Sequence, residues 1–309
     1  MRSAIANAAH VAFTRKGDGL RIVLEGCKGM EEKIPIDEAE IYVRREGVGG
    51  KPIMLVHGIA LNSDMWRYQV PYLKQRGYEV VTLDLRGFGK SQYVTTNTRA
   101  EYTYERWAKD LDRVIQHYGL RHVTMVGYSM GGAIVMEYMM DYSGSVDKFV
   151  LVDAAGPNMQ EKLPFPDNDR LAATCLGIET FRDLVIAIGQ AGDDQAAKAA
   201  ADDAFEYFWR LTFPTIRLVH YPDGIDGLTW VREMFEGCTH EALVSGLTQM
   251  HDTEIKLDGY KINTPITVCH GLLDAFVPFG LGEKTYRDLR PYSDLEMIMA
   301  GHELVCALH

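Results

Sequence analysis

A serine flanked by glycines lies between a strand-like run and a helix-like run. The motif Gly-Tyr-Ser-Met-Gly places Ser129 between Gly127 and Gly131, after the apolar residues 123–126 and before a helical pattern over 132–142. A serine in a tight strand-to-helix turn takes a strained backbone, so small residues are needed two positions away on either side. The turn exposes the hydroxyl at a helix N-terminus, where free amides face the reacting centre. Ser129 is therefore the candidate nucleophile.

A base and an acid follow in a compatible order. A serine hydroxyl is a poor nucleophile until a histidine, oriented by a carboxylate, takes its proton. The strand-like run 266–271 leads to Asp274, and the run 295–299 leads to His302. Residues just after parallel strands meet at one edge of a sheet, so we expect both side chains beside Ser129. The candidate triad is Ser129, Asp274 and His302.

Three other side chains compete for roles near this site. Asp153 follows the apolar run 149–152 and is the alternative acid. His57 precedes a glycine, and we expect it to bond the backbone and shape the turn rather than act as a second base. His270 lies at a strand end and is interpreted as a core residue. Asp274 is preferred to Asp153.

The reaction intermediate needs two backbone amides as hydrogen-bond donors. One donor is usually the amide after the nucleophile, and the other comes from a loop after an earlier strand. Here Met130 follows the serine, and Ile59 follows a strand-like run over 51–56. Gly58 permits a close approach of the chain. We therefore expect the amides of Ile59 and Met130 to form the oxyanion hole.

Motifs along the chain are similar to those of the α/β-hydrolase superfamily, close to bacterial arylesterases and cofactor-free haloperoxidases (perhydrolases). The resemblance is dense over 39–156 and 262–302. It implies a mostly parallel eight-stranded sheet flanked by helices, a helical cap, serine esterase activity, and neither metal nor organic cofactor. The blocks that carry it are His57-Gly58, Asp64-Met65-Trp66, Arg76-Gly77-Tyr78, 84–91, 127–132, 270–278 and Gly301-His302.

The resemblance also implies a division of the chain. Residues 1–30 form an extension, 31–156 and 261–309 the hydrolase core, and 157–260 a helical cap inserted after the sixth core strand. The family normally continues past its histidine with a final helix, whereas only Glu303 to His309 remain here. We therefore expect either a mobile histidine loop or support from a second copy, which would make a homodimer.

Within the core, periodicity predicts particular elements. Residues 32–36 and 39–45 read as an antiparallel hairpin, and 78–85 and 148–152 as buried strands preceded by helices, which gives a parallel sheet. Apolar residues from Trp107 to Tyr118 recur at helical spacing and predict a helix that Gly119 ends. These elements hold the site residues at one edge.

Aromatic side chains are the candidates for the substrate pocket. Trp66 and Tyr128 lie next to the motifs above, and Phe208 and Trp209 belong to an aromatic cluster of the cap. If they face Ser129, they select a hydrophobic acyl or alcohol group. The alternative is that the cluster packs the cap onto the core and that Trp66 is a packing residue.

Composition excludes several partners. The formal charge of −11 argues against nucleic acid and anionic membranes. Five scattered cysteines lack the pairing of a zinc site or a disulfide scaffold, which favours reduced thiols in the cytoplasm. The expected partner is a small-molecule ester.

The identity of the nucleophile narrows the chemistry. Within the superfamily that the chain resembles, haloalkane dehalogenases and epoxide hydrolases need aspartate where Ser129 lies. Hydrolysis of an ester is preferred, and lactone, thioester, amide and carbon–carbon hydrolysis stay open. A ligand-binding receptor with vestigial turnover is the alternative of another class.

Overall fold

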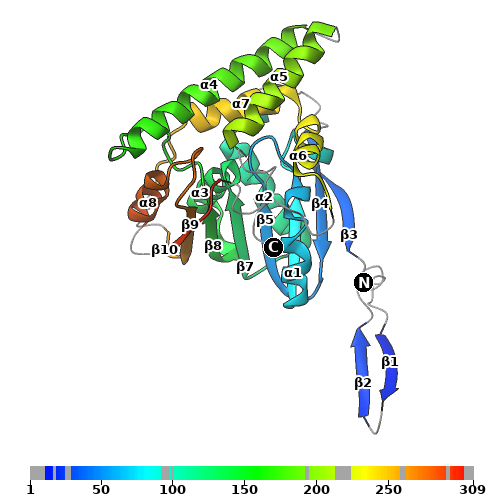
Figure 1. The fold of residues 1–309 in the computed structure, drawn as a ribbon. Coiled ribbons are helices and arrows are strands. Elements are labelled where there is room, and N and C mark those ends of the chain that lie inside the picture. The colour runs from blue at the N-terminus through cyan, green and yellow to red at the C-terminus, as the bar shows by residue number, and fades with distance from the viewer. Residues whose placement is uncertain are drawn as a thin grey trace.

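An eight-stranded sheet forms the centre of the molecule in this computed structural model (Figure 1). The structure describes residues 29–91, 98, 101–191, 195–212, 224–257, 262–289 and 293–302, and the backbone of 11–16 and 19–24. The strand order is β10-β9-β8-β7-β5-β6-β4-β3. The strands are β3 (Met30–Ile36), β4 (Ala39–Glu46), β5 (Lys51–Val56), β6 (Tyr78–Leu83), β7 (Val123–Tyr128), β8 (Val146–Val152), β9 (Ile266–Gly271) and β10 (Ser293–Ile298).

The sheet is mostly parallel, as predicted. β3 and β4 form the expected antiparallel hairpin, and β4 also pairs antiparallel with β6. The pairs from β6 through β10 are parallel. The carboxyl ends of β5, β7, β8, β9 and β10 therefore share one edge, and each is followed by a segment that carries a candidate site residue.

Helices flank this sheet. The predicted helix over Trp107 to Tyr118 is confirmed as part of α2, where Thr103 caps the N-terminus and left-handed Gly119 ends the helix. Its apolar stripe is buried against the sheet and α3. The core helices are α1 (Gln69–Gln75), α2 (Tyr104–Tyr118), α3 (Met130–Asp141) and α8 (Phe279–Asp288), with short 3₁₀ turns η1 (Ser63–Trp66), η2 (Gly89–Ser91) and η4 (Ser143–Ser145).

The segment between β8 and β9 is helical in its described parts. It contains α4 (Asp167–Ala191), α5 (Gln195–Thr212), α6 (Gly227–Glu236) and α7 (His240–Asp252). α4, α5 and α7 lie together across one end of the sheet (Figure 1). None of the helices in the described ranges is long and apolar enough to span a membrane.

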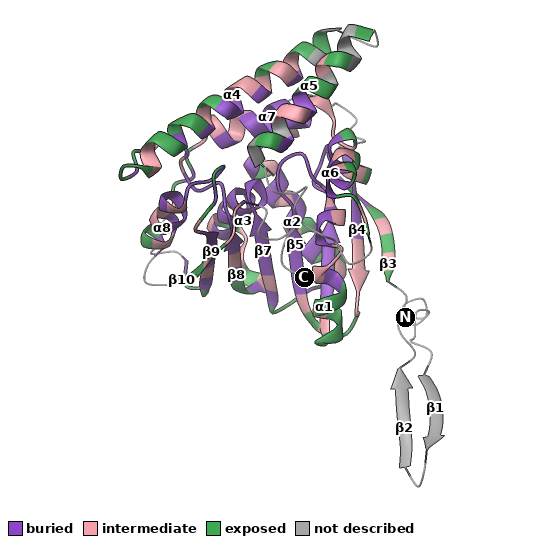
Figure 2. Ribbon diagram, viewed as in Figure 1, coloured by how far each residue is buried: buried purple, intermediate pink, exposed green. Residues whose placement is uncertain are grey.

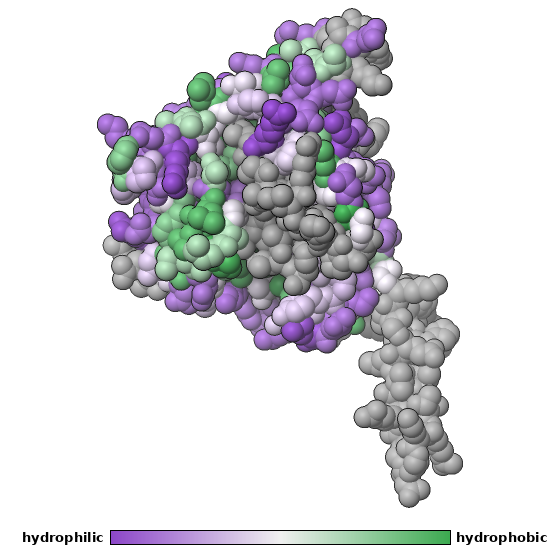
Figure 3. Space-filling model, viewed as in Figure 1, coloured by the Kyte–Doolittle hydropathy of each residue, from purple (hydrophilic) through white to green (hydrophobic). Residues whose placement is uncertain are grey.

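Burial follows the layers. Strands and inward helix faces are buried, whereas outer helix faces are exposed (Figure 2). Apolar surface gathers near β9 and β10, where Leu273, Met297 and Met299 are exposed (Figure 3). The N-terminal extension contains a feature that sequence analysis missed, an antiparallel pair of β1 (Val11–Lys16) and β2 (Gly19–Leu24).

Candidate active site

The turn between β7 and α3 holds Ser129 in a strained conformation. Its φ is 52° and its ψ is −121°, a region that non-glycine residues rarely adopt. A Cβ at Gly127 would lie 2.5 Å from the carbonyl oxygen of Gly131, and one at Gly131 would lie 2.4 Å from that of His57. The two glycines are therefore required by close backbone contacts, which is the physical reason behind the sequence motif.

A continuous chain of hydrogen bonds joins Ser129, His302 and Asp274. The Ser129 hydroxyl donates to His302 Nε2 at 3.0 Å, and His302 Nδ1 donates to Asp274 Oδ2 at 2.8 Å. All three residues are at most 3 % exposed. This arrangement can move a proton from the hydroxyl to the imidazole while the carboxylate stabilises the resulting charge.

The loop after β9 fixes the other oxygen of Asp274. Asp274 Oδ1 accepts hydrogen bonds from the amides of Phe276 at 2.9 Å and Val277 at 2.7 Å. The Phe276 ring also lies beside His302, with 4.9 Å between ring centroids. These two backbone donors hold Asp274 Oδ1 in place and so orient Oδ2 toward His302.

Both proposed oxyanion residues are buried beside the nucleophile. Met130 is the first residue of α3, and a Cβ on Gly58 would lie 3.1 Å from the Ser129 Cβ. The side chains of Ile59 and Met130 pack against Gly246 of α7, where a Cβ would lie 2.5 Å from Ile59 Cδ1. α7 therefore packs against both residues whose amides are proposed as donors.

His57 holds this segment as expected for a residue that bonds the backbone. The Leu85 amide donates to His57 Nε2 at 2.9 Å, so the ring proton is on Nδ1, which donates to the Gly58 carbonyl at 2.8 Å. Burial lowers the pKa of His57, although Asp84 lies nearby, so the neutral ring is favoured. Because the peptide unit is planar, fixing the Gly58 carbonyl also fixes the direction of the Ile59 N–H.

Asp153 and His270 lie directly behind the acid. Asp153 is fully buried and accepts a hydrogen bond from the Gly271 amide at 2.8 Å. His270 Nε2 donates to the Val277 carbonyl at 2.8 Å, and burial lowers its pKa. Asp153, His270 and Asp274 each place a potential ligand atom within 4.8 Å of the others. Asp153, His270 and Asp274 each bond a nearby backbone group through one of their polar atoms.

The four aromatic residues named for the pocket have different surroundings. Tyr128 is buried, its hydroxyl donates to the His302 carbonyl at 2.6 Å, and its ring lies 5.2 Å from the His302 ring. Trp66 and Trp209 are also buried. The side chain of Phe208 lies outside the described residues. Sequence reasoning missed the bond from Tyr128, because no local signal pairs a strand residue with a carbonyl that lies 174 positions away.

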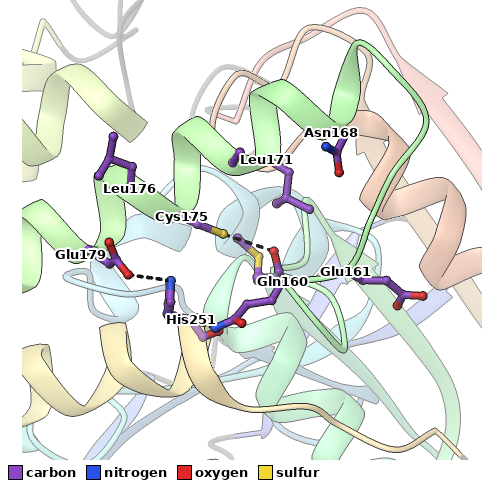
Figure 4. Close-up of a pocket in the computed structure, with 10 residues that line it drawn as sticks. Gln160, Glu161, Asn168, Leu171, Cys175, Leu176, Glu179 and His251 are labelled. Atoms are coloured by element: carbon purple, nitrogen blue, oxygen red, sulfur yellow. Dashed lines mark hydrogen bonds and ion pairs between the residues drawn. The ribbon is translucent and has the colours of Figure 1, made fainter.

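One described pocket lies away from these groups (Figure 4). It has a volume of about 340 Å³ and lies between α4, the loop after β8 and the end of α7. His251 Nε2 faces Glu179 at 3.2 Å within it. Its lining includes none of the three triad residues.

Known proteins share both the sequence and the fold. Residues 51–174 match the family model described as alpha/beta hydrolase fold. A non-heme haloperoxidase of Rhodococcus erythropolis is 30 % identical over 81 % of this chain and 84 % of its own length.

Among solved structures, a bromoperoxidase from Bacillus anthracis is 29 % identical, with a TM-score of 0.69 over 90 % of this chain and 94 % of that one. An esterase from Exiguobacterium antarcticum, 24 % identical, shares the fold with a TM-score of 0.70 over 90 % of this chain and 93 % of that one. The chain belongs to the α/β-hydrolase family.

Proposed function

We propose that the protein is a serine hydrolase that cleaves carboxylic esters through an acyl-enzyme intermediate. The observation that carries the proposal is the hydrogen-bonded chain Ser129–His302–Asp274 at a strained turn. Such strain is retained where the surrounding structure holds it for function. A protein named as a haloperoxidase shares the sequence, and a protein named as an esterase shares the fold on which this site is built.

Each residue has one role in the proposed reaction. His302 takes the Ser129 proton as Oγ attacks the ester carbonyl, and Asp274 keeps the imidazole in the Nδ1–H tautomer. The amides of Ile59 and Met130 bind the oxyanion. His302 then gives its proton to the leaving alcohol, and a water molecule releases the acid by the same steps in reverse order. Hydrogen peroxide in place of water would yield a peracid as a side activity.

The proposed substrates are small to medium esters with hydrophobic groups. Phe276 lies beside His302, and Gly246 of α7 packs against the apolar side chains of Ile59 and Met130, which supports a hydrophobic substrate group. Cys175, Cys238 and Cys269 are free thiols, which supports a cytoplasmic location for the enzyme.

Hydrolysis of p-nitrophenyl esters of graded acyl length tests this function. We expect turnover by the wild type and loss of at least ~1000-fold in kcat for Ser129→Ala, because the nucleophile is removed. A fluorophosphonate probe should label the wild type and not the variant. If the wild type cleaves no ester and is not labelled, the proposal is wrong. If the enzyme cleaves a lactone, thioester or amide of the same acyl group but no ester, that bond and not an ester is its substrate.

The identity of the acid is tested by two matched variants. Asp274→Asn should lower kcat by ~1000-fold or more, because an amide favours the wrong histidine tautomer. Asp153→Asn keeps the same shape behind the site and should lower kcat much less. The reverse order of the two effects would assign the acid to Asp153.

A further inference from the structure

The loop that presents the acid also contacts α4. The Thr174 hydroxyl donates to the carbonyl of Phe276 at 2.6 Å, across 102 positions of sequence. Thr174 is 2 % exposed. A helical threonine commonly donates to its own helix four residues back, as Thr180 does to the carbonyl of Leu176 at 2.8 Å. Thr174 instead directs its proton out of α4 to the core.

The bond from Thr174 reaches Asp274 through a single peptide unit. The carbonyl of Phe276 and the N–H of Val277 belong to the same planar amide, and that N–H donates to Asp274 Oδ1 at 2.7 Å. A donor on the carbonyl side polarises the amide and strengthens the N–H as a donor. The hydroxyl on α4 therefore fixes and strengthens a bond to the carboxylate that orients His302.

A second contact ties the same helix to the same region. Asp167, the first residue of α4, accepts a hydrogen bond from the Gly280 amide of α8 at 3.0 Å. A Cβ on Gly282 of α8 would lie against the ring of His270, whose Nε2 donates to the carbonyl of Val277. α4 thus contacts the acid loop directly and also the helix that packs behind it.

We propose that Thr174 is a positioning residue for the acid, so that the placement of the helical segment on the core sets the geometry of the triad. The proposal rests on the serine hydrolase function above. Its consequence is that α4 takes part in setting the geometry of the active site. A shift of α4 relative to β9 changes the bond to Asp274 and hence the orientation of the carboxylate toward His302.

The test compares Thr174→Val, Thr174→Ser and Thr180→Val. Valine keeps the shape of threonine and removes the hydroxyl, whereas serine restores it. We expect Thr174→Val to lower kcat by ~10-fold with KM changed less than ~2-fold, because a buried carbonyl loses its donor and the carboxylate loses order. Thr174→Ser should recover most of kcat. Thr180→Val, the matched change on the same helix, should keep wild-type kcat.

Two readouts separate positioning from unfolding. Titration with the fluorophosphonate probe counts active sites, so that kcat is expressed per competent molecule. The downfield proton resonance of the His302 Nδ1–H should be present in the wild type and in Thr174→Ser, and broadened or lost in Thr174→Val. A wild-type kcat per site together with an unchanged resonance in Thr174→Val would overturn the proposal.

Failure of the proposed function gives a different pattern. In that case the wild type neither cleaves esters nor reacts with the probe, and Thr174→Val cannot differ from it in either assay. The proton resonance does not depend on turnover, so it still decides the link to Thr174. Its loss in Thr174→Val alone would support the link, and its persistence in all variants would refute it.

Discussion

Tyr128 links the strand that carries the nucleophile to the segment that carries the base. Its hydroxyl donates to the His302 carbonyl at 2.6 Å, and both groups are buried. Tyr128→Phe keeps the ring that lies against His302 and removes only this hydroxyl. The variant therefore measures how far a single backbone hydrogen bond holds the histidine in place.

The magnitude follows from the buried carbonyl that is left without this donor. An unsatisfied buried acceptor costs about 1 to 3 kcal/mol. Because a tenfold change in rate corresponds to about 1.4 kcal/mol, loss of that energy from the position of His302 lowers kcat by about 5- to 150-fold, and we expect about 10-fold. The melting temperature should fall by about 2 to 6 °C for a chain of this size.

Steady-state kinetics on a p-nitrophenyl ester and thermal unfolding check this expectation. Tyr138→Phe is the matched control: Tyr138 is fully buried on α3, and its hydroxyl has no hydrogen-bond partner in the described part of the chain. We expect the control to keep wild-type kcat and to be at least as stable. Equal kcat for Tyr128→Phe and Tyr138→Phe would refute the positioning argument for Tyr128.

Two further predictions concern stability. Arg86 is fully buried and bonds both oxygens of Asp110, at 2.8 and 2.9 Å, while burial raises the pKa of Asp110. Arg86→Met should therefore lower the free energy of unfolding, measured in urea, by about 3 to 5 kcal/mol, because it leaves a buried carboxylate without its partner. Adding Asp110→Leu should restore part of the lost stability. If the double variant is no more stable than Arg86→Met, the pairing argument is wrong. Burial lowers the pKa of His57 and His270 in the fold, whereas the unfolded chain binds their protons near pH 6.5. Keeping both rings neutral therefore costs no stability above pH 6.5. At pH values below 6.5, the free energy of unfolding should fall by up to about 1.4 kcal/mol per pH unit for each histidine. Urea unfolding between pH 7.5 and 5 should show that the free energy of unfolding depends less on pH in His270→Gln than in the wild type. An equal pH dependence would exclude His270 as a source of the loss of stability in acid.

Local patterns were sufficient for much of the fold. The hairpin of β3 and β4, the stripe of α2 and the strand before Ser129 were predicted correctly, because each depends on periodicity and turn residues within a short window. The pair β1–β2 was missed, although Gly17-Asp18-Gly19 between two partly apolar runs is a turn signal that favours a hairpin.

In the candidate site, too, some features follow from local sequence patterns and others depend on contacts between distant parts of the chain. The sequence alone determined the nucleophile turn, since Gly127 is demanded by a contact with Gly131 within the turn itself, together with the order of the acid and the base. Only the tertiary structure decided which groups hold those residues. Thr174 and Tyr128 act across more than a hundred positions, through backbone carbonyls that carry no sequence signature. A side chain's partner among distant carbonyls is set by how the layers pack, and that is the information a local pattern lacks.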